Sequence, residues 1–110
     1  MKSEKQKRLE KAGWKVGDAA DLLRLNEDER RFVEMKLALA EGLRRRRAKL
    51  GMTQADLARR LASSQSRVAK MEAADKTVSL DLLIRGLLAL GATRQEIARL
   101  IRITDAVRAA

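Results

Sequence analysis

Apolar residues recur three and four positions apart along most of this chain, which is the spacing of helices that bury one face. No stretch alternates apolar and polar residues in the way a half-buried strand does. Gly51 and Gly91 stand directly after apolar runs, where helices commonly end. The pattern predicts an all-α fold of about five to six helices.

A long amphipathic helix is predicted from residue 26 to residue 50. Asn26 and Glu29 have the spacing of a capping box at its start. We expect its inward stripe to consist of Phe32, Leu39, Leu43 and Leu50, widened by Val33, Met35, Leu37 and Ala40.

Residues 53–73 have the layout of two short helices joined by a tight turn. Thr53 can cap the first helix, the small residues 62–64 interrupt the apolar spacing, and Ser64 can cap the second helix, which Gln65 opens. The positions that we expect to face inward are Leu57, Ala58 and Leu61 on the first helix, and Val68 and Met71 on the second.

The outward face of the second helix carries hydrogen-bonding and cationic side chains near its N-terminus. Side chains of these types, placed at the start of a helix, read base edges in the major groove of DNA. The candidate base-reading residues are Gln65, Ser66, Lys70 and Arg67. The candidate phosphate-binding residues, which would set the register on the duplex, are Gln54, Ser64, Arg44 and Arg46. The alternative is that Gln65 and Ser66 are ordinary polar surface residues on a capped helix.

The distribution of charge supports a DNA-binding surface. The chain has a net charge of +10, and residues 41–70 account for +7 of it, with nine Lys and Arg residues against Glu41 and Asp56. A positive surface that coincides with the two-helix motif is what binding to phosphates requires. The simpler alternative is a generally basic, solvated surface.

Composition argues against several other functions. The chain has no cysteine and no histidine, and also no tyrosine and no proline. A thiol nucleophile, an imidazole base and the usual zinc ligands are therefore missing, so we expect no enzyme, no catalytic residue, no metal and no cofactor. The charged start has no apolar run of a signal peptide, and no apolar stretch is long enough to span a membrane. These features predict a cytoplasmic protein.

Residues 43–90 resemble the lambda-repressor-like (Cro/XRE) family of helix-turn-helix DNA-binding proteins. The residues that carry the resemblance are Arg47, Gly51, Met52, Thr53, Gln54, Leu57, Ala58, Leu61, Ser64, Gln65, Val68 and Glu72. Three places depart from the family pattern: Ala62 replaces the usual turn glycine, Ser63 replaces an apolar residue, and 73–75 replace the frequent Asn-Gly-Lys exit. The resemblance implies a structural ion pair between Arg47 and Glu72, and a homodimer on a palindromic operator.

The whole arrangement is similar to one subgroup, the XRE-type antitoxins related to HigA. The similarity rests on GWKVGDAADLL near the start, on SSQSRVAKMEA in the motif and on VSLDLLIRGLLALGA after it. It implies an antitoxin that represses its own operon and binds a toxin of the RelE/HigB type. The alternative function is a protein-interaction module that uses a helix-turn-helix scaffold to bind a partner protein without reading DNA.

We divide the chain into residues 1–25, a basic N-terminal arm followed by a short helix, and residues 26–110, an XRE-type helix-turn-helix domain. Residues 1–12 are either a disordered end or an arm that reaches DNA phosphates. The apolar residues of 14–25 either close the core or dock on a second subunit or partner. In the homodimer, the expected interface is the C-terminal stripe Ile97, Leu100 and Ile101, with Trp14 and Leu22 as alternative contributors.

Overall fold

The protein is described by a computed structural model, and the structure describes residues 4–11 and 27–109. The all-α prediction is confirmed, since these residues form helices and no strand. The elements are α1 (Glu4–Lys11), α3 (Glu27–Lys49), α4 (Gln54–Arg60), α5 (Gln65–Glu72), α6 (Leu80–Ala89) and α7 (Arg94–Ala109). The expected helix over 18–25, the cap at Asn26, Trp14 and Leu22 lie outside the described residues.

Polar side chains start the helices where the sequence predicts. The Thr53 hydroxyl accepts the backbone N–H of Asp56, whose carboxylate accepts the N–H of Thr53. Ser64 and Ser79 cap α5 and α6 through one such bond each. Thr93 and Glu96 form a second reciprocal box before α7. These bonds satisfy N–H groups that a helix start leaves without partners, so each helix begins at a defined residue.

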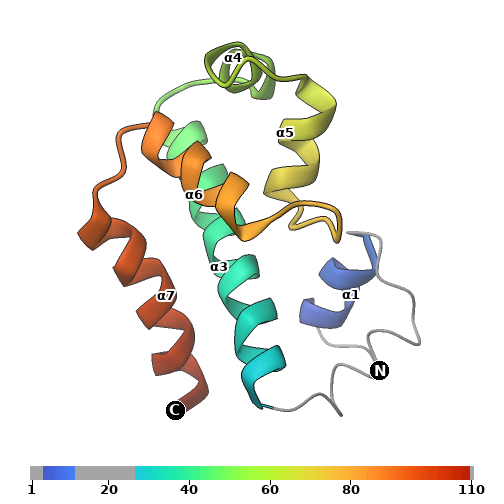
Figure 1. Cartoon of the computed structure of the whole chain (residues 1–110), viewed down its shortest axis with the longest axis vertical. Coiled ribbons are helices and arrows are strands. Elements are labelled where there is room, and N and C mark those ends of the chain that lie inside the picture. The colour runs from blue at the N-terminus through green and yellow to red at the C-terminus, as the bar shows by residue number, and fades with distance from the viewer. Residues whose placement is uncertain (1–3, 12–26, 110) are drawn as a thin grey trace.

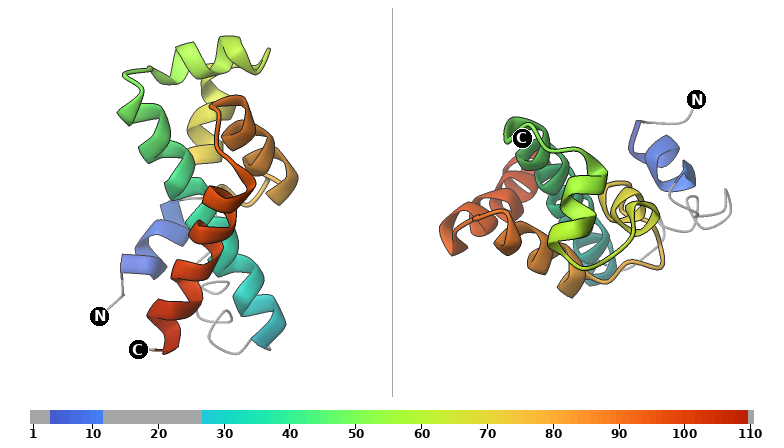
Figure 2. Two further views of the ribbon diagram at one scale, coloured as in Figure 1. Left: turned by 90° about the vertical axis from the view of Figure 1, so that its left-hand side faces the viewer. Right: turned by 90° about the horizontal axis from the view of Figure 1, so that it is seen from above.

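The long helix α3 is the central element, and the shorter helices pack around it (Figures 1 and 2). It contacts α5, α6 and α7, while α4 packs mainly on α5 and crosses the top of the molecule in Figure 1. In both figures α5 and α1 lie on one side of α3 and α7 lies on the other. The largest core side chains that are buried completely are Leu39, Leu43, Leu57, Val68, Met71, Leu83 and Leu87.

The inward stripe of α3 differs from the prediction at its two ends. Phe32 is 49% exposed, because at this end the buried positions are Val33 and Leu37, and Val33 is turned by about 100° from Phe32. Leu50 is 52% exposed because it follows the last residue of the helix and lies beyond the core. The expectation that these two side chains face inward is wrong, while Leu39 and Leu43 are buried as expected.

Within the part of the chain that the structure describes, no helix is both long and apolar enough to cross a membrane.

Candidate nucleic-acid interface

Helices α4 and α5 pack closely through small and apolar side chains. Leu57 and Ala58 on α4, and Val68 and Met71 on α5, are at most 4% exposed. The turn between the helices closes with a bond of 2.8 Å from the N–H of Ser63 to the carbonyl of Ala58. Residue 62 in this turn has a φ of +54°, a left-handed conformation that glycine adopts without strain. Ala62 therefore adopts the backbone conformation for which the glycine usual in the family would be favoured.

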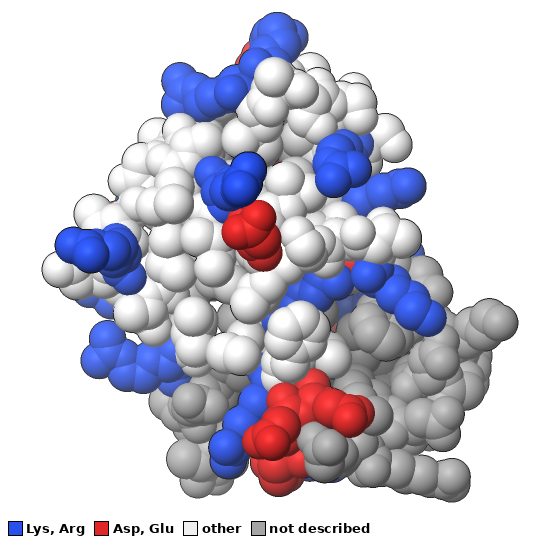
Figure 3. Space-filling view, in the orientation of Figure 1, with Lys and Arg blue, Asp and Glu red and all other residues white. Residues whose placement is uncertain are grey.

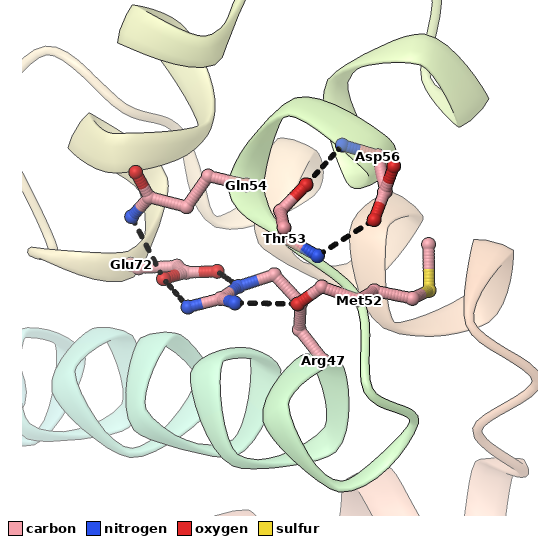
Figure 4. A network of polar contacts seen from close by, with 6 residues as sticks. All are labelled: Arg47, Met52, Thr53, Gln54, Asp56 and Glu72. Atoms are coloured by element: carbon pink, nitrogen blue, oxygen red, sulfur yellow. Dashed lines mark hydrogen bonds and ion pairs between the residues drawn. The ribbon is translucent and has the colours of Figure 1, made fainter.

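Arg47 and Glu72 join α3 to the end of α5 (Figure 4). Arg47 donates to Glu72 from Nε, and from Nη2 at 2.9 Å, in a bidentate geometry. A third nitrogen, Nη1, donates to the carbonyl of Met52 at 2.8 Å. The pKa of Arg47 is raised above its ordinary value, mainly by the hydrogen bond with Glu72. Because Glu72 is buried and Met52 lies two positions before the first residue of α4, one guanidinium fixes α5 relative to both α3 and the start of α4.

Gln54 belongs to the same network. Its side-chain amide donates to Glu72 Oε1 at 3.1 Å, from the first residue of α4. The sequence predicts a phosphate contact for Gln54 and does not indicate this bond, since a local pattern does not show a contact across 18 positions. An amide has two N–H donors, so the bond to Glu72 leaves one for another acceptor.

The exit of α5 is also held by α3, through a residue that the sequence pattern did not single out. Lys36 is 6% exposed, and its Nζ lies 3.5 Å from the carbonyl of Lys76 in the following loop. Burial lowers the pKa of Lys36, while the charge of Asp75 acts in the opposite direction. Asp75 in turn accepts bonds from the N–H and hydroxyl of Thr77 at 2.9 and 2.7 Å. The signal in the sequence was a lysine within the otherwise apolar residues 35–40.

The outward face of α5 presents the expected polar side chains. Gln65, Ser66, Arg67 and Lys70 are exposed, and they extend from the first turn of α5 to its second. Ser64 caps the helix by accepting the N–H of Arg67 at 3.1 Å. In Figure 3, Lys and Arg side chains stand out at the top and upper right of the molecule, over α4 and α5, and also along its left side, whereas most of the acidic side chains in view gather at the lower end. The positive end of the α5 dipole adds to this field.

The four consecutive arginines of α3 have different surroundings. Arg44 and Arg45 are exposed and donate to Glu41 at 2.5 and 3.1 Å. Arg46 points elsewhere: its Nε donates to the carbonyl of Leu90 at 2.9 Å and its Nη1 to Glu96 at 2.8 Å. Both partners belong to the α6–α7 region, on the side of α3 away from α5 (Figure 2). Two nitrogens of Arg46 are thus bonded within the chain, and its assignment to DNA phosphate stays a prediction.

The expected dimer stripe is used within the single chain. Ile97 is 8% exposed in the core, and Leu100 and Ile101 pack against the same core. Leu100 also covers Gly42 so closely that a Cβ at that position would collide with it. Within the single chain this stripe packs on the monomer core, and the dimer interface expected there stays a prediction. An amphipathic stripe looks the same in sequence whether it meets its own chain or a second one.

Among the described residues, no group of three or more acidic, histidine or cysteine side chains is placed to hold a metal ion.

Comparison with protein-family models matches residues 38–100 to a helix-turn-helix domain. The match covers more than half of the chain, includes α4 and α5, and begins within α3. The chain therefore belongs to this family of helix-turn-helix domains, a DNA-binding class. Comparisons with curated proteins and with solved structures gave no match.

Proposed function

We propose that this protein is a transcriptional regulator that binds a specific DNA sequence and represses transcription. The observation that carries the proposal is the set of exposed side chains on α5, in a helix whose angle is fixed by the buried pair of Arg47 and Glu72. A rigid helix that presents polar groups at its N-terminal end suits the major groove. The family match supports the DNA-binding part of the proposal.

Each exposed residue of α5 has a proposed role. Gln65 hydrogen bonds adenine through its amide, and Lys70 meets guanine acceptors about one turn further on. Ser66 contacts a neighbouring base, and Arg67 binds either a base or a phosphate. Ser64, Arg44 and the second amide N–H of Gln54 bind phosphates and fix the register. Arg46 is proposed to act mainly within the fold, because it is bonded to Leu90 and Glu96.

We further propose that the protein is a cytoplasmic homodimer that recognises a palindromic operator. A single helix of this kind makes few base contacts, and two-fold dimers place two such helices about one turn of DNA apart. Ile97 is buried in the monomer core, whereas Leu100 and Ile101 pack against it and stay partly exposed, so we propose that further surface adds to the interface. Leu88, 50% exposed on α6, is an apolar side chain available for it.

The finer proposal is an autoregulating antitoxin whose partner is a toxin of the RelE/HigB type. It rests on the resemblance to HigA-like proteins. Co-expression with the reading frame next to its gene tests it: we expect relief of growth arrest and co-purification. A neighbouring protein that neither arrests growth nor binds this chain would contradict the antitoxin role.

Selection of duplexes from a random pool, followed by affinity measurements, tests the DNA-binding function. Gln65→Ala should lose about 1–3 kcal/mol on the selected sequence and little on random DNA. Arg44→Ala should weaken both equally and make the slope of log affinity against log salt shallower by about 0.9 for each phosphate that is no longer bound. Equal losses on both DNAs with Gln65→Ala would remove Gln65 from base reading. If no sequence is selected and a partner protein binds instead, the scaffold is an interaction module.

A further inference from the structure

The N-terminal helix α1 borders an open cleft on the α5 side of α3. The cleft has a volume of about 420 Å³ and is lined by Arg8, Lys11, Glu41, Arg44, Glu72 and Ala73. Helix α1 thus forms one wall, α3 the floor, and the end of α5 the other wall. Figures 1 and 2 show α1 on the same side of α3 as α5. The cleft is therefore next to the proposed DNA-binding helix.

One ion pair between described residues connects α1 to α3. Arg8 Nη2 lies 3.3 Å from Glu41 Oε2, and the side chains are 41% and 22% exposed. Glu41 Oε1 accepts from Arg44 and Arg45. Burial alone would raise the pKa of Glu41, but these arginines and Arg8 together hold it below its ordinary value. Glu41 is thus ionised and shared among three guanidinium groups.

Positive charge remains in excess around the cleft. Both carboxylates of the lining are bound by arginines, Glu41 by three of them and Glu72 by Arg47. Each guanidinium has five N–H donors, and the contacts of Arg8 and Arg44 with Glu41 each use a single terminal nitrogen. Lys11 adds an exposed ammonium group from α1. N–H donors that are not in use and surplus positive charge thus converge on the cleft from α1 and α3. Groups of this kind bind phosphate.

We propose that this cleft binds a phosphate group between Arg8 and Lys11 on α1 and Arg44 on α3. The phosphate belongs either to the DNA backbone beside the groove that α5 enters or to a free phosphorylated molecule. Binding of a DNA phosphate rests on the proposed function, whereas binding of a free phosphorylated molecule does not. In either case the bound phosphate would add a second link between α1 and α3, beside the partly exposed pair of Arg8 and Glu41.

Lys11→Ala tests the site, with Lys7→Ala as the matched control. Both lysines are exposed on α1, both changes remove one charge and introduce a good helix former, and only Lys11 lines the cleft. The first measurement is the affinity of the full chain for a short random-sequence duplex over a series of salt concentrations. The second is a titration with pyrophosphate at constant ionic strength, followed by the backbone amide resonances of Lys11, Arg44 and Ala73.

If the phosphate is that of DNA, Lys11→Ala should make the salt slope shallower by about 0.9 per bound chain, and Lys7→Ala should leave it unchanged. If the phosphate is free, pyrophosphate should shift the three resonances in the wild-type chain and in Lys7→Ala, and not in Lys11→Ala. Equal behaviour of the two variants in both measurements overturns the site. A wild-type chain that binds no DNA refutes the proposed function, and the pyrophosphate titration then decides the cleft alone.

Discussion

Arg47 and Glu72 lie 25 positions apart in the chain, and the guanidinium of one faces the carboxylate of the other in a bidentate pair. Their side chains are 16% and 4% exposed, so water screens this pair far less than it screens the surface pairs. Glu72 also accepts from Gln54, and Arg47 also binds the carbonyl of Met52. The pair therefore sets the position of α5 relative to α3 and to the start of α4.

We expect Glu72→Ala to lower the free energy of unfolding by roughly 3–5 kcal/mol, because it leaves the Arg47 guanidinium partly buried without a carboxylate. Chemical denaturation measures this change. Asp81→Ala is the control, since it breaks the pair of Asp81 and Arg85, whose side chains are 75% and 73% exposed. An exposed pair of this kind is worth at most about 1 kcal/mol. Equal stability of the two variants would show that the pair of Arg47 and Glu72 does not act as a buried one.

The sequence predicted this helix-turn-helix arrangement because its signals are local. Thr53, Ser64 and Ser79 each start a helix by a bond to an N–H three residues ahead, and the residue types alone indicate such a bond. Gly51 and Gly91 have the positive φ values expected of residues that follow a helix. For the same reason the outward face of α5 could be predicted from the positions of Val68 and Met71.

The partners of the arginines could not be predicted in the same way. Four consecutive helical positions point in four directions, and only the positions of α6 and α7 determine that Arg46 meets Leu90 and Glu96. Similarly, the bond of Gln54 to Glu72 depends on how α4 crosses α5. Phe32 has the periodicity of a core residue and is nevertheless half exposed, because the buried side of α3 turns toward Val33 at that end.

Arg46→Ala should destabilise the fold without changing the salt dependence of DNA binding. Arg46 joins the end of α6 to the first turn of α7, and its bond to the carbonyl of Leu90 has a charged donor, a kind that contributes about 1.5–3 kcal/mol. Thermal unfolding and the salt slope on random DNA are the two measurements. Arg45→Ala serves as the control for stability, since that side chain is 75% exposed. A shallower slope at unchanged stability would identify Arg46 as a phosphate-binding residue and not a structural one.

The stability of the fold should depend on pH through Glu96. The pKa of Glu96 is lowered from 4.5 to about 2. The largest cause is the hydrogen bond from the N–H of Thr93, and the next is the hydrogen bond from Arg46. A carboxyl whose pKa is lower in the folded state stabilises the fold above its unfolded pKa, and this contribution is lost as pH falls through the folded pKa.

We therefore expect the wild-type chain to exceed Glu96→Gln in melting temperature above about pH 5, and the difference to shrink as pH falls toward 2. Other carboxyls with lowered pKa values, such as Asp56 and Asp75, are present in both proteins and cancel in the comparison. A difference that stays constant over this range would mean that the ionisation of Glu96 is not coupled to folding.

The two alanines with left-handed backbones should differ in their response to glycine. Ala62 has a φ of +54° and is exposed, whereas Ala74 has a φ of +55° and is 2% exposed. Glycine relieves about 1–2 kcal/mol of strain at either site, and the greater freedom of the unfolded chain offsets about 0.4–1 kcal/mol of that. At Ala74 the change also removes a buried methyl group, worth about 0.8 kcal/mol. Denaturation midpoints should therefore rise for Ala62→Gly and stay about level for Ala74→Gly. Ala62→Val, with a β-branched side chain at positive φ, should fall below both. A midpoint for Ala62→Gly no higher than that of the wild-type chain would mean that the strain relieved in the turn between α4 and α5 does not exceed the added freedom of the unfolded chain.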